Sequence, residues 1–151
     1  MSESVLVSPH IITSIEKLRA RLGELNATAE SLCQKHFDFV MAENKKKDWD
    51  DKSVLFVQSR LRDNTMSVTW YVVRWYGSKA MKTRRMVKKV IVKPRIKYSY
   101  NMETMRNKSQ PWEFEMVQET EQAVMPIRRE VWFISKVLTS LNKISKNGGE
   151  S

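Results

Sequence analysis

Two segments of the chain carry hydrophobic side chains at alternating spacings of three and four residues, the spacing of one face of an α-helix. They cover residues 8–45 and residues 109–146. The spaced positions are Ile11, Ile15, Leu18, Leu22, Leu25, Ala29, Leu32, His36 and Phe39 in the first segment, and Val117, Thr120, Val124, Ile127, Val131, Ile134, Leu138 and Leu141 in the second. Both are heptad patterns, so we expect two long helices that bury these faces on another helix, either in the same chain or in a second copy.

Capping residues and prolines indicate where these helices begin and bend. Ser8-Pro9 and Ser109-Gln110-Pro111 each combine a capping serine with a proline, which is tolerated in the first helical turn. Glu113 and Glu115 follow the second of these starts, where the positive end of the helix dipole favours carboxylates. Pro126 lies inside the second segment, so we expect a kink or a break there.

Between the two helical segments, in residues 54–93, the hydrophobic period changes to two and β-branched and aromatic residues become frequent. This pattern predicts strands at Val54–Arg60, Met66–Tyr76 and Lys82–Lys93. Asp63-Asn64 and Gly77-Ser78 are turn signals, and Pro94 ends the third strand. Strands with such short links form an antiparallel meander. Arg95–Lys108 shows no clear period, and we interpret it as a connector.

These elements predict the fold class α+β, with a three-stranded antiparallel meander flanked by two long heptad-patterned helices in the order α-β-β-β-α. The length of 151 residues suits a single domain over residues 1–151. The simplest arrangement packs both helices together against one sheet face. A homodimer through the N-terminal helix is the alternative, and the sequence does not decide between packing in cis and in trans.

The excess of basic residues is concentrated in the middle of the chain. The formal net charge is +10, but residues 45–108 alone carry +13, while residues 1–44 carry −2 and residues 109–151 carry −1. One acid-free stretch contains Lys79, Lys82, Arg84, Arg85, Lys88, Lys89, Lys93, Arg95 and Lys97. Such a patch costs stability by self-repulsion and attracts polyanions. It favours a nucleic-acid surface over a merely solvated face, with an acidic protein or a membrane surface as the remaining alternatives.

The residues that catalysis or metal binding would need are scarce. The single cysteine, Cys33, and the two histidines, His10 and His36, supply neither a zinc site nor a catalytic triad. Four scattered glycines make no phosphate loop. We interpret Asp48, Asp50, Asp51, Glu113 and Glu115 as connector and helix-start residues rather than as a magnesium site, and Tyr98 and Tyr100 as non-catalytic. We therefore expect no enzyme, metal or cofactor.

No signal peptide or membrane span is recognisable in the sequence, and the single cysteine is typical of a reduced compartment, so we expect a cytoplasmic protein.

Strand alternation in Trp70–Tyr76 places some aromatic side chains away from the helices and beside the basic third strand. Such a surface can stack unpaired bases, or a basic two-stranded ribbon can lie in a duplex groove. The expected nucleic-acid contacts are Arg74, Lys79, Lys82, Arg84, Arg85, Lys88, Lys89, Lys93, Arg95 and Lys97. Duplex DNA is favoured over a single strand. A coiled-coil scaffold whose basic face meets an acidic protein, and an RNA-binding regulator, stay open as alternatives.

The order of an aromatic strand, a basic return strand, the motif Pro111-Trp112-Glu113 and a helix with Ile127-Arg128-Arg129-Glu130 resembles the small auxiliary mobilisation proteins of conjugative elements. The resemblance covers roughly residues 66–132. It implies binding at or near an origin of transfer and assistance to a separate relaxase, without catalysis. The positions that match the pattern are Trp70, Arg74, Trp75, Trp112 and Arg128.

Overall fold

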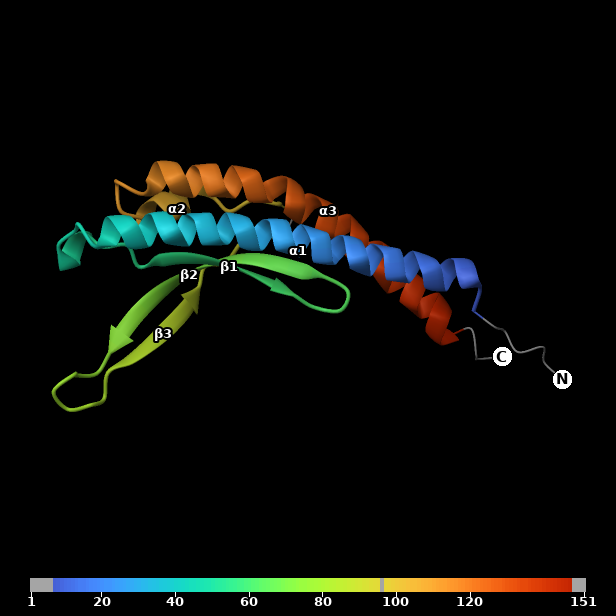
Figure 1. Cartoon of the computed structure of the whole chain (residues 1–151), viewed down its shortest axis with the longest axis horizontal. Helices are drawn as coiled ribbons and strands as arrows, with labels where there is room; N and C mark the ends of the chain where they lie inside the picture. The colour runs from blue at the N-terminus through green and yellow to red at the C-terminus, as the bar shows by residue number, and fades with distance from the viewer. Residues whose placement is uncertain (1–6, 96, 148–151) are drawn as a thin grey trace.

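The computed structural model describes residues 7–95 and 97–147 of the chain (Figure 1). Its elements are α1 (Pro9–Asn44), a short 3-10 turn η1 (Trp49–Asp51), β1 (Leu55–Leu61), β2 (Met66–Tyr76), β3 (Arg85–Val90), α2 (Met102–Lys108) and α3 (Phe114–Asn147). The strands form one antiparallel sheet of order β1-β2-β3. The expected α+β class, with two long helices around an antiparallel meander, is therefore confirmed. No helix within the described residues is both long and apolar enough to cross a lipid bilayer.

The core lies between the two long helices and one face of the sheet (Figure 1). Along the first half of β2 every second side chain is buried, as the alternation of a strand requires. Trp70 is at the centre of this face and has no exposed surface. Its ring packs edge-on against the imidazole of His36 from α1, with ring centroids 4.9 Å apart. The indole Nε1 donates a hydrogen bond of 3.0 Å to the carboxylate of Glu121 from α3.

The heptad face of α1 is buried within the chain itself. The helix begins as expected, because the Ser8 hydroxyl accepts a hydrogen bond from the amide of His10 at 3.2 Å. Leu22, Ala29 and Val40 on the apolar face are completely buried, and the helix packs against α3 and β1. In this structure the N-terminal heptad face therefore packs in cis.

Of the two outcomes expected at Pro126, a kink or a break, the break does not occur, because α3 is one continuous helix through the proline. Proline removes one backbone N–H from the helix and normally bends it, and Figure 1 shows α3 as a single coil whose axis changes direction along its length. Val124 and Ile127, on either side of the proline, are both buried in the core. Their tertiary packing holds the two halves in one helix despite the missing hydrogen bond.

The segment before α3 differs from the expected connector because it contains the short helix α2. The Asn101 side chain caps this helix by accepting hydrogen bonds from the amides of Glu103 and Thr104 at 2.9 and 3.2 Å. Ser109 ends α2 rather than beginning the next helix, since its amide donates to the carbonyl of Met105. A helix of seven residues is too short to show a hydrophobic period, which explains why the sequence pattern missed it.

Glu113 is not in the first turn of α3, as the sequence suggested, but lies just before it and is completely buried. Neither carboxylate oxygen has a hydrogen-bond partner among the described residues. Burial penalises the charged form, outweighs the opposing effects of the nearby Ser53 side chain and Gln110 backbone, and raises the pKa of this carboxyl to about 7. Glu113 is therefore a source of instability whenever it is ionised.

Replacing Glu113 with glutamine is expected to stabilise the protein at pH 8 by about 2 kcal/mol, with a much smaller gain at pH 5. The pKa of Glu113 is higher in the folded than in the unfolded state, so its favourable contribution is complete below about pH 4.5 and is lost as the pH rises through 7. Urea denaturation at both pH values measures the difference. Glu115→Gln, which changes an exposed carboxyl on the next turn, is the control. Equal gains at the two pH values would contradict this account.

Candidate nucleic-acid interface

The long strand β2 belongs to two different hairpins. Its first half pairs with β1, from Leu61 opposite Met66 to Leu55 opposite Val72. Its second half pairs with β3, from Tyr71 opposite Val90 to Tyr76 opposite Arg85. Beyond Val72 the ribbon has no third strand, and residues 73–90, which we call the arm, project away from the helices (Figure 1).

The end of the arm is a tight turn that requires glycine. Gly77 has a φ of +82°, and a Cβ atom added there would lie 2.2 Å from the carbonyl oxygen of Thr83. The Ser78 amide donates to the Thr83 hydroxyl, and the Thr83 amide donates to the carbonyl of Ser78, both at 3.0 Å. These contacts close the turn and return the chain into β3.

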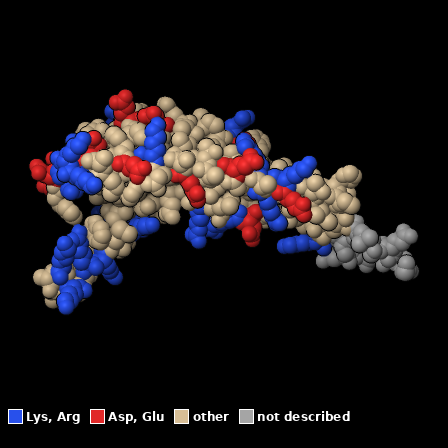
Figure 2. All heavy atoms as spheres, in the orientation of Figure 1, with Lys and Arg blue, Asp and Glu red and all other residues tan. Residues whose placement is uncertain are grey.

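The arm carries most of the basic residues that were expected to contact nucleic acid. Its sequence contains Arg74, Lys79, Lys82, Arg84, Arg85, Lys88 and Lys89 and no acidic residue. All are exposed, and within the described residues none of them forms an ion pair. Figure 2 shows basic side chains gathered on the projecting arm, whereas the body has basic and acidic groups mixed. The positive charge of the arm therefore has no acidic partner within the described residues.

The strand register divides the arm into two unlike faces. Arg74 lies opposite Val87 and Arg85 opposite Tyr76, and both arginines share a face with Lys89. Trp75 lies opposite Met86 on the other face, near the guanidinium of Arg84, which lies 4.5 Å from the centre of the Trp75 ring. The face with Arg74, Arg85 and Lys89, which we call the cationic face, also carries Tyr76 and Val87, and the other face carries Trp75, Met86 and Lys88.

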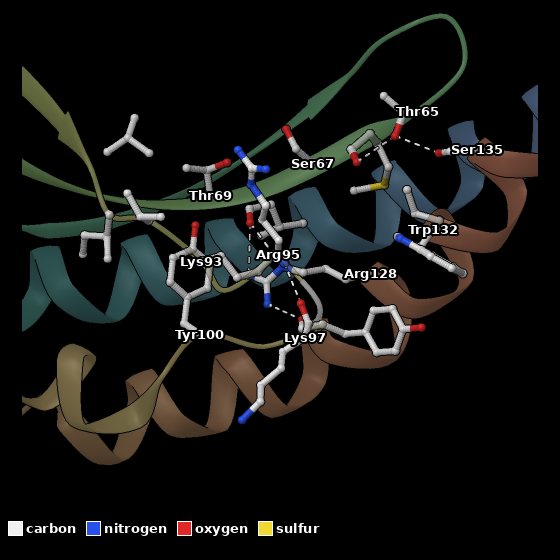
Figure 3. A pocket seen from close by; sticks show the side chains of 17 residues that line it. Thr65, Ser67, Thr69, Lys93, Arg95, Lys97, Tyr100, Arg128, Trp132 and Ser135 are labelled. Atoms are coloured by element: carbon white, nitrogen blue, oxygen red, sulfur yellow. Dashed lines mark hydrogen bonds between the residues drawn. The ribbon is translucent and has the colours of Figure 1, made fainter. Parts of the chain in front are cut away.

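Lys93, Arg95 and Lys97 do not lie on the arm but on the connector that follows it. They line a hollow of about 730 Å³ between β2, this connector and α3 (Figure 3). The Lys93 ammonium is half-buried and donates hydrogen bonds to the carbonyls of Pro94 and Lys97. This burial lowers the pKa of Lys93. The sequence grouped the ten basic residues together, and the structure places three of them apart from the others.

A buried polar network joins the first half of β2, the connector and α3. Its centre is an ion pair at 2.7 Å between the Arg128 guanidinium and the Glu121 carboxylate. Glu121 also accepts from the amide of Tyr100 at 2.8 Å, besides the Trp70 indole. Arg128 donates twice to the carbonyl of Val68, at 3.2 and 3.0 Å, and once to the carbonyl of Tyr98 at 3.0 Å. We call these residues the Glu121–Arg128 network; Figure 3 shows two of its members, Arg128 and Tyr100.

A family model described as MobI protein matches residues 25–142. The chain belongs to the MobI family. MobI is a family of accessory mobilisation proteins, so the class of protein that the sequence resemblance indicated is confirmed. The match also extends beyond the expected range of residues 66–132, because it includes the second half of α1. No curated protein and no solved structure matches the chain.

The structure separates the residues that carried the resemblance to mobilisation proteins into two groups. Trp70 and Arg128 belong to the buried network, and Trp112 lies in the turn before α3, where its Nε1 donates to the carbonyl of Asp51 at 2.7 Å. Arg74 and Trp75 are exposed on the arm. Within this MobI family member, the first group is held by hydrogen bonds inside the fold and the second is exposed on the arm.

Three other side chains of this MobI family member that are capable of acid–base or nucleophilic chemistry, His36, Cys33 and Tyr100, are buried in the fold. His36 is buried, its Nδ1 lies 3.0 Å from the Thr120 hydroxyl, and desolvation lowers its pKa to about 4. Cys33 is also buried, and desolvation raises its pKa to about 11. The Tyr100 hydroxyl accepts the amide hydrogen of Trp70 at 3.1 Å. Among the described residues, no three His, Cys, Asp or Glu side chains are grouped so that they could hold a metal ion.

Sequence reasoning missed Trp49, which it treated as part of a polar connector. The ring lies in η1, is 67% exposed, and its centre is 5.9 Å from the Arg84 guanidinium of the arm. The only feature of the local sequence that could have indicated a role for Trp49 is a large apolar side chain between acidic residues. The contact with Arg84 itself joins residues far apart in the chain and leaves no local pattern.

Proposed function

We propose that this MobI family member binds duplex DNA at or near an origin of transfer and assists a separate relaxase there, acting in the cytoplasm without catalysing a reaction itself. The observation that carries the proposal is the arm, a two-stranded ribbon that projects from the body with seven basic residues and no acidic ones. The family supports the assignment to mobilisation.

The dimensions of the arm suit a DNA groove. The major groove of B-DNA is about 12 Å wide and admits a two-stranded β-ribbon. In that position the guanidinium groups of Arg74 and Arg85 and the ammonium of Lys89, all on one face of the ribbon, reach phosphates or base edges. Long basic side chains that are exposed and without ion pairs can make these contacts without breaking any bond of the described fold.

Residues beside the arm extend the proposed contact. Arg95 and Lys97 are exposed at the rim of the hollow, where DNA leaving the arm would pass. We assign Lys93 a different role from its neighbours, because its ammonium holds two connector carbonyls. Lys93 therefore positions the connector that carries Arg95 and Lys97.

The test is a titration of the full chain against a fluorescein-labelled duplex containing the element's origin of transfer, followed by anisotropy. An unrelated duplex, a single strand and an RNA duplex of equal length are the comparisons. Four to seven phosphate contacts predict that the logarithm of the binding constant falls with the logarithm of the salt concentration with a slope of about −4 to −6. Tighter binding to the origin duplex than to the unrelated one would support recognition of that site.

Absence of binding to any nucleic acid at low salt would contradict the proposal. If the chain then formed stable oligomers in solution, the coiled-coil scaffold would be the better interpretation. Tighter binding to RNA than to DNA of the same length would instead favour an RNA-binding regulator.

A further inference from the structure

An apolar groove of about 350 Å³ lies at the root of the arm, between the C-terminal part of α1, η1 and the outer part of the sheet. Aromatic rings of Phe37, Trp49, Phe56 and Trp75 line it, together with the thioether of Met86. Trp49 and Trp75 are 67% and 49% exposed. Two neighbouring solvent-exposed tryptophans are unusual in a fold that buries Trp70 completely, because burial of the indole ring against other apolar groups is strongly favourable.

The charges at this aromatic groove indicate which kind of molecule fits it. The lining residues include Lys52 and no acidic residue. The Arg84 guanidinium lies over both tryptophans, 4.5 Å from the ring centre of Trp75 and 5.9 Å from that of Trp49. Indole faces beside an arginine provide a stacking surface for a planar base and a cation for its phosphate. A purely apolar protein side chain would use the rings but would leave this cation without a partner.

We propose that the aromatic groove holds one unpaired base of the DNA that the arm grips. This inference rests on the proposed function, because the arm has to bring DNA to the groove. In the complex, the cationic face of the arm contacts the paired region, and a base that has left the stack lies against Trp49 and Trp75. Arg84 contacts the phosphate of that nucleotide.

The groove accepts the base without reading its identity. The lining amide of Asn44 is already used, since its Oδ1 accepts from the amide of Ser53 at 2.8 Å. The Ser53 hydroxyl accepts from the amide of Leu55 at 3.1 Å. Apart from the Lys52 ammonium, the polar side chains that line the groove are therefore engaged within the protein, and stacking, which every base can make, supplies most of the binding.

The test compares two labelled duplexes of equal sequence, one fully paired and one with a single bulged thymine, titrated with the full chain and followed by anisotropy. The wild-type protein is expected to bind the bulged duplex about tenfold more tightly, the ratio that one stacked base provides. Trp49→Ala is expected to bring this ratio close to one while leaving the affinity for the paired duplex unchanged. Trp49→Phe, which keeps a ring, retains most of the preference.

Trp132→Ala is the control for a tryptophan outside the groove: Trp132 is a 40% exposed indole on α3 that lines the hollow beside the connector instead, so its removal is expected to leave the ratio of the two affinities unchanged, whatever its effect on either affinity. Equal wild-type affinity for the two duplexes would overturn the inference and leave the proposed function intact. So would a preference that survives Trp49→Ala or that Trp132→Ala abolishes equally. Self-association that is lost in Trp49→Ala, with no bulge preference, would assign the groove to a second copy. Failure to bind either duplex would overturn both proposals.

Discussion

Reversing the charge at Arg84, Arg85, Lys88 and Lys89 to glutamate is expected to weaken DNA binding roughly a hundredfold or more at low salt, on every sequence tested. All four side chains are exposed on the arm, and none has an ion-pair partner among the described residues. Each lost phosphate contact removes about one unit from the salt slope, so the slope flattens by about four. Anisotropy titrations at several salt concentrations measure both effects.

The same number of charges reversed elsewhere is the control for long-range electrostatics. Lys17, Lys35, Lys143 and Lys146 are exposed on α1 and α3, away from the arm. Their replacement by glutamate changes the net charge equally but is expected to lower affinity much less, because only contacts at the interface release bound counterions. Equal losses in the two variants would show that total charge, and not the arm, carries the binding. Circular dichroism of both variants tests whether they remain folded, as expected for substitutions at exposed positions.

Replacing Arg128 by methionine is expected to lower the free energy of unfolding by about 3–5 kcal/mol. The Glu121 carboxylate is almost completely buried and would lose its cationic partner while remaining out of reach of water. The change also leaves the carbonyls of Val68 and Tyr98 without their donors. Urea denaturation at pH 7 measures the loss.

Two further variants separate this network effect from a simple loss of packing. Removing both charges in Glu121→Gln with Arg128→Met is expected to cost less than Arg128→Met alone, because no uncompensated buried charge remains. Arg129→Met, at the exposed neighbouring position, is expected to change the stability by less than about 1 kcal/mol. A double variant at least as unstable as Arg128→Met alone would contradict a coupled network.

Hydrophobic periodicity located the long elements because it depends only on neighbours in the chain. The observed β2 coincides with the predicted strand Met66–Tyr76, and α1 begins at the predicted proline. The prediction of an element or of a residue's exposure was wrong where the element was too short to show a period, or where residues distant in the sequence decide whether a side chain is buried. It missed α2, extended β3 to Lys93, and put Glu113 in a solvated helical turn although the fold buries it.

The sequence predicted which basic residues belong to the candidate interface, but it did not predict how they are arranged in space. Seven of the ten basic residues expected at the interface lie together on the arm because the strands that carry them are neighbours in the chain. Trp49 joins this region through a contact with Arg84, 35 positions away in the sequence. No local property of the connector around Trp49 indicates that contact.

By itself, the sequence determined the types of the long elements, their order and the location of the positive charge, since periodicity and charge are properties of short stretches. Only the tertiary structure decided that β2 leaves β1 at Val72 and continues with β3 alone. Strand pairing depends on register and on where each partner ends, and β1 starts at Leu55, opposite Val72. The ribbon beyond that point has no third strand and is not covered by the helices, which is why the charge projects from the body as an arm.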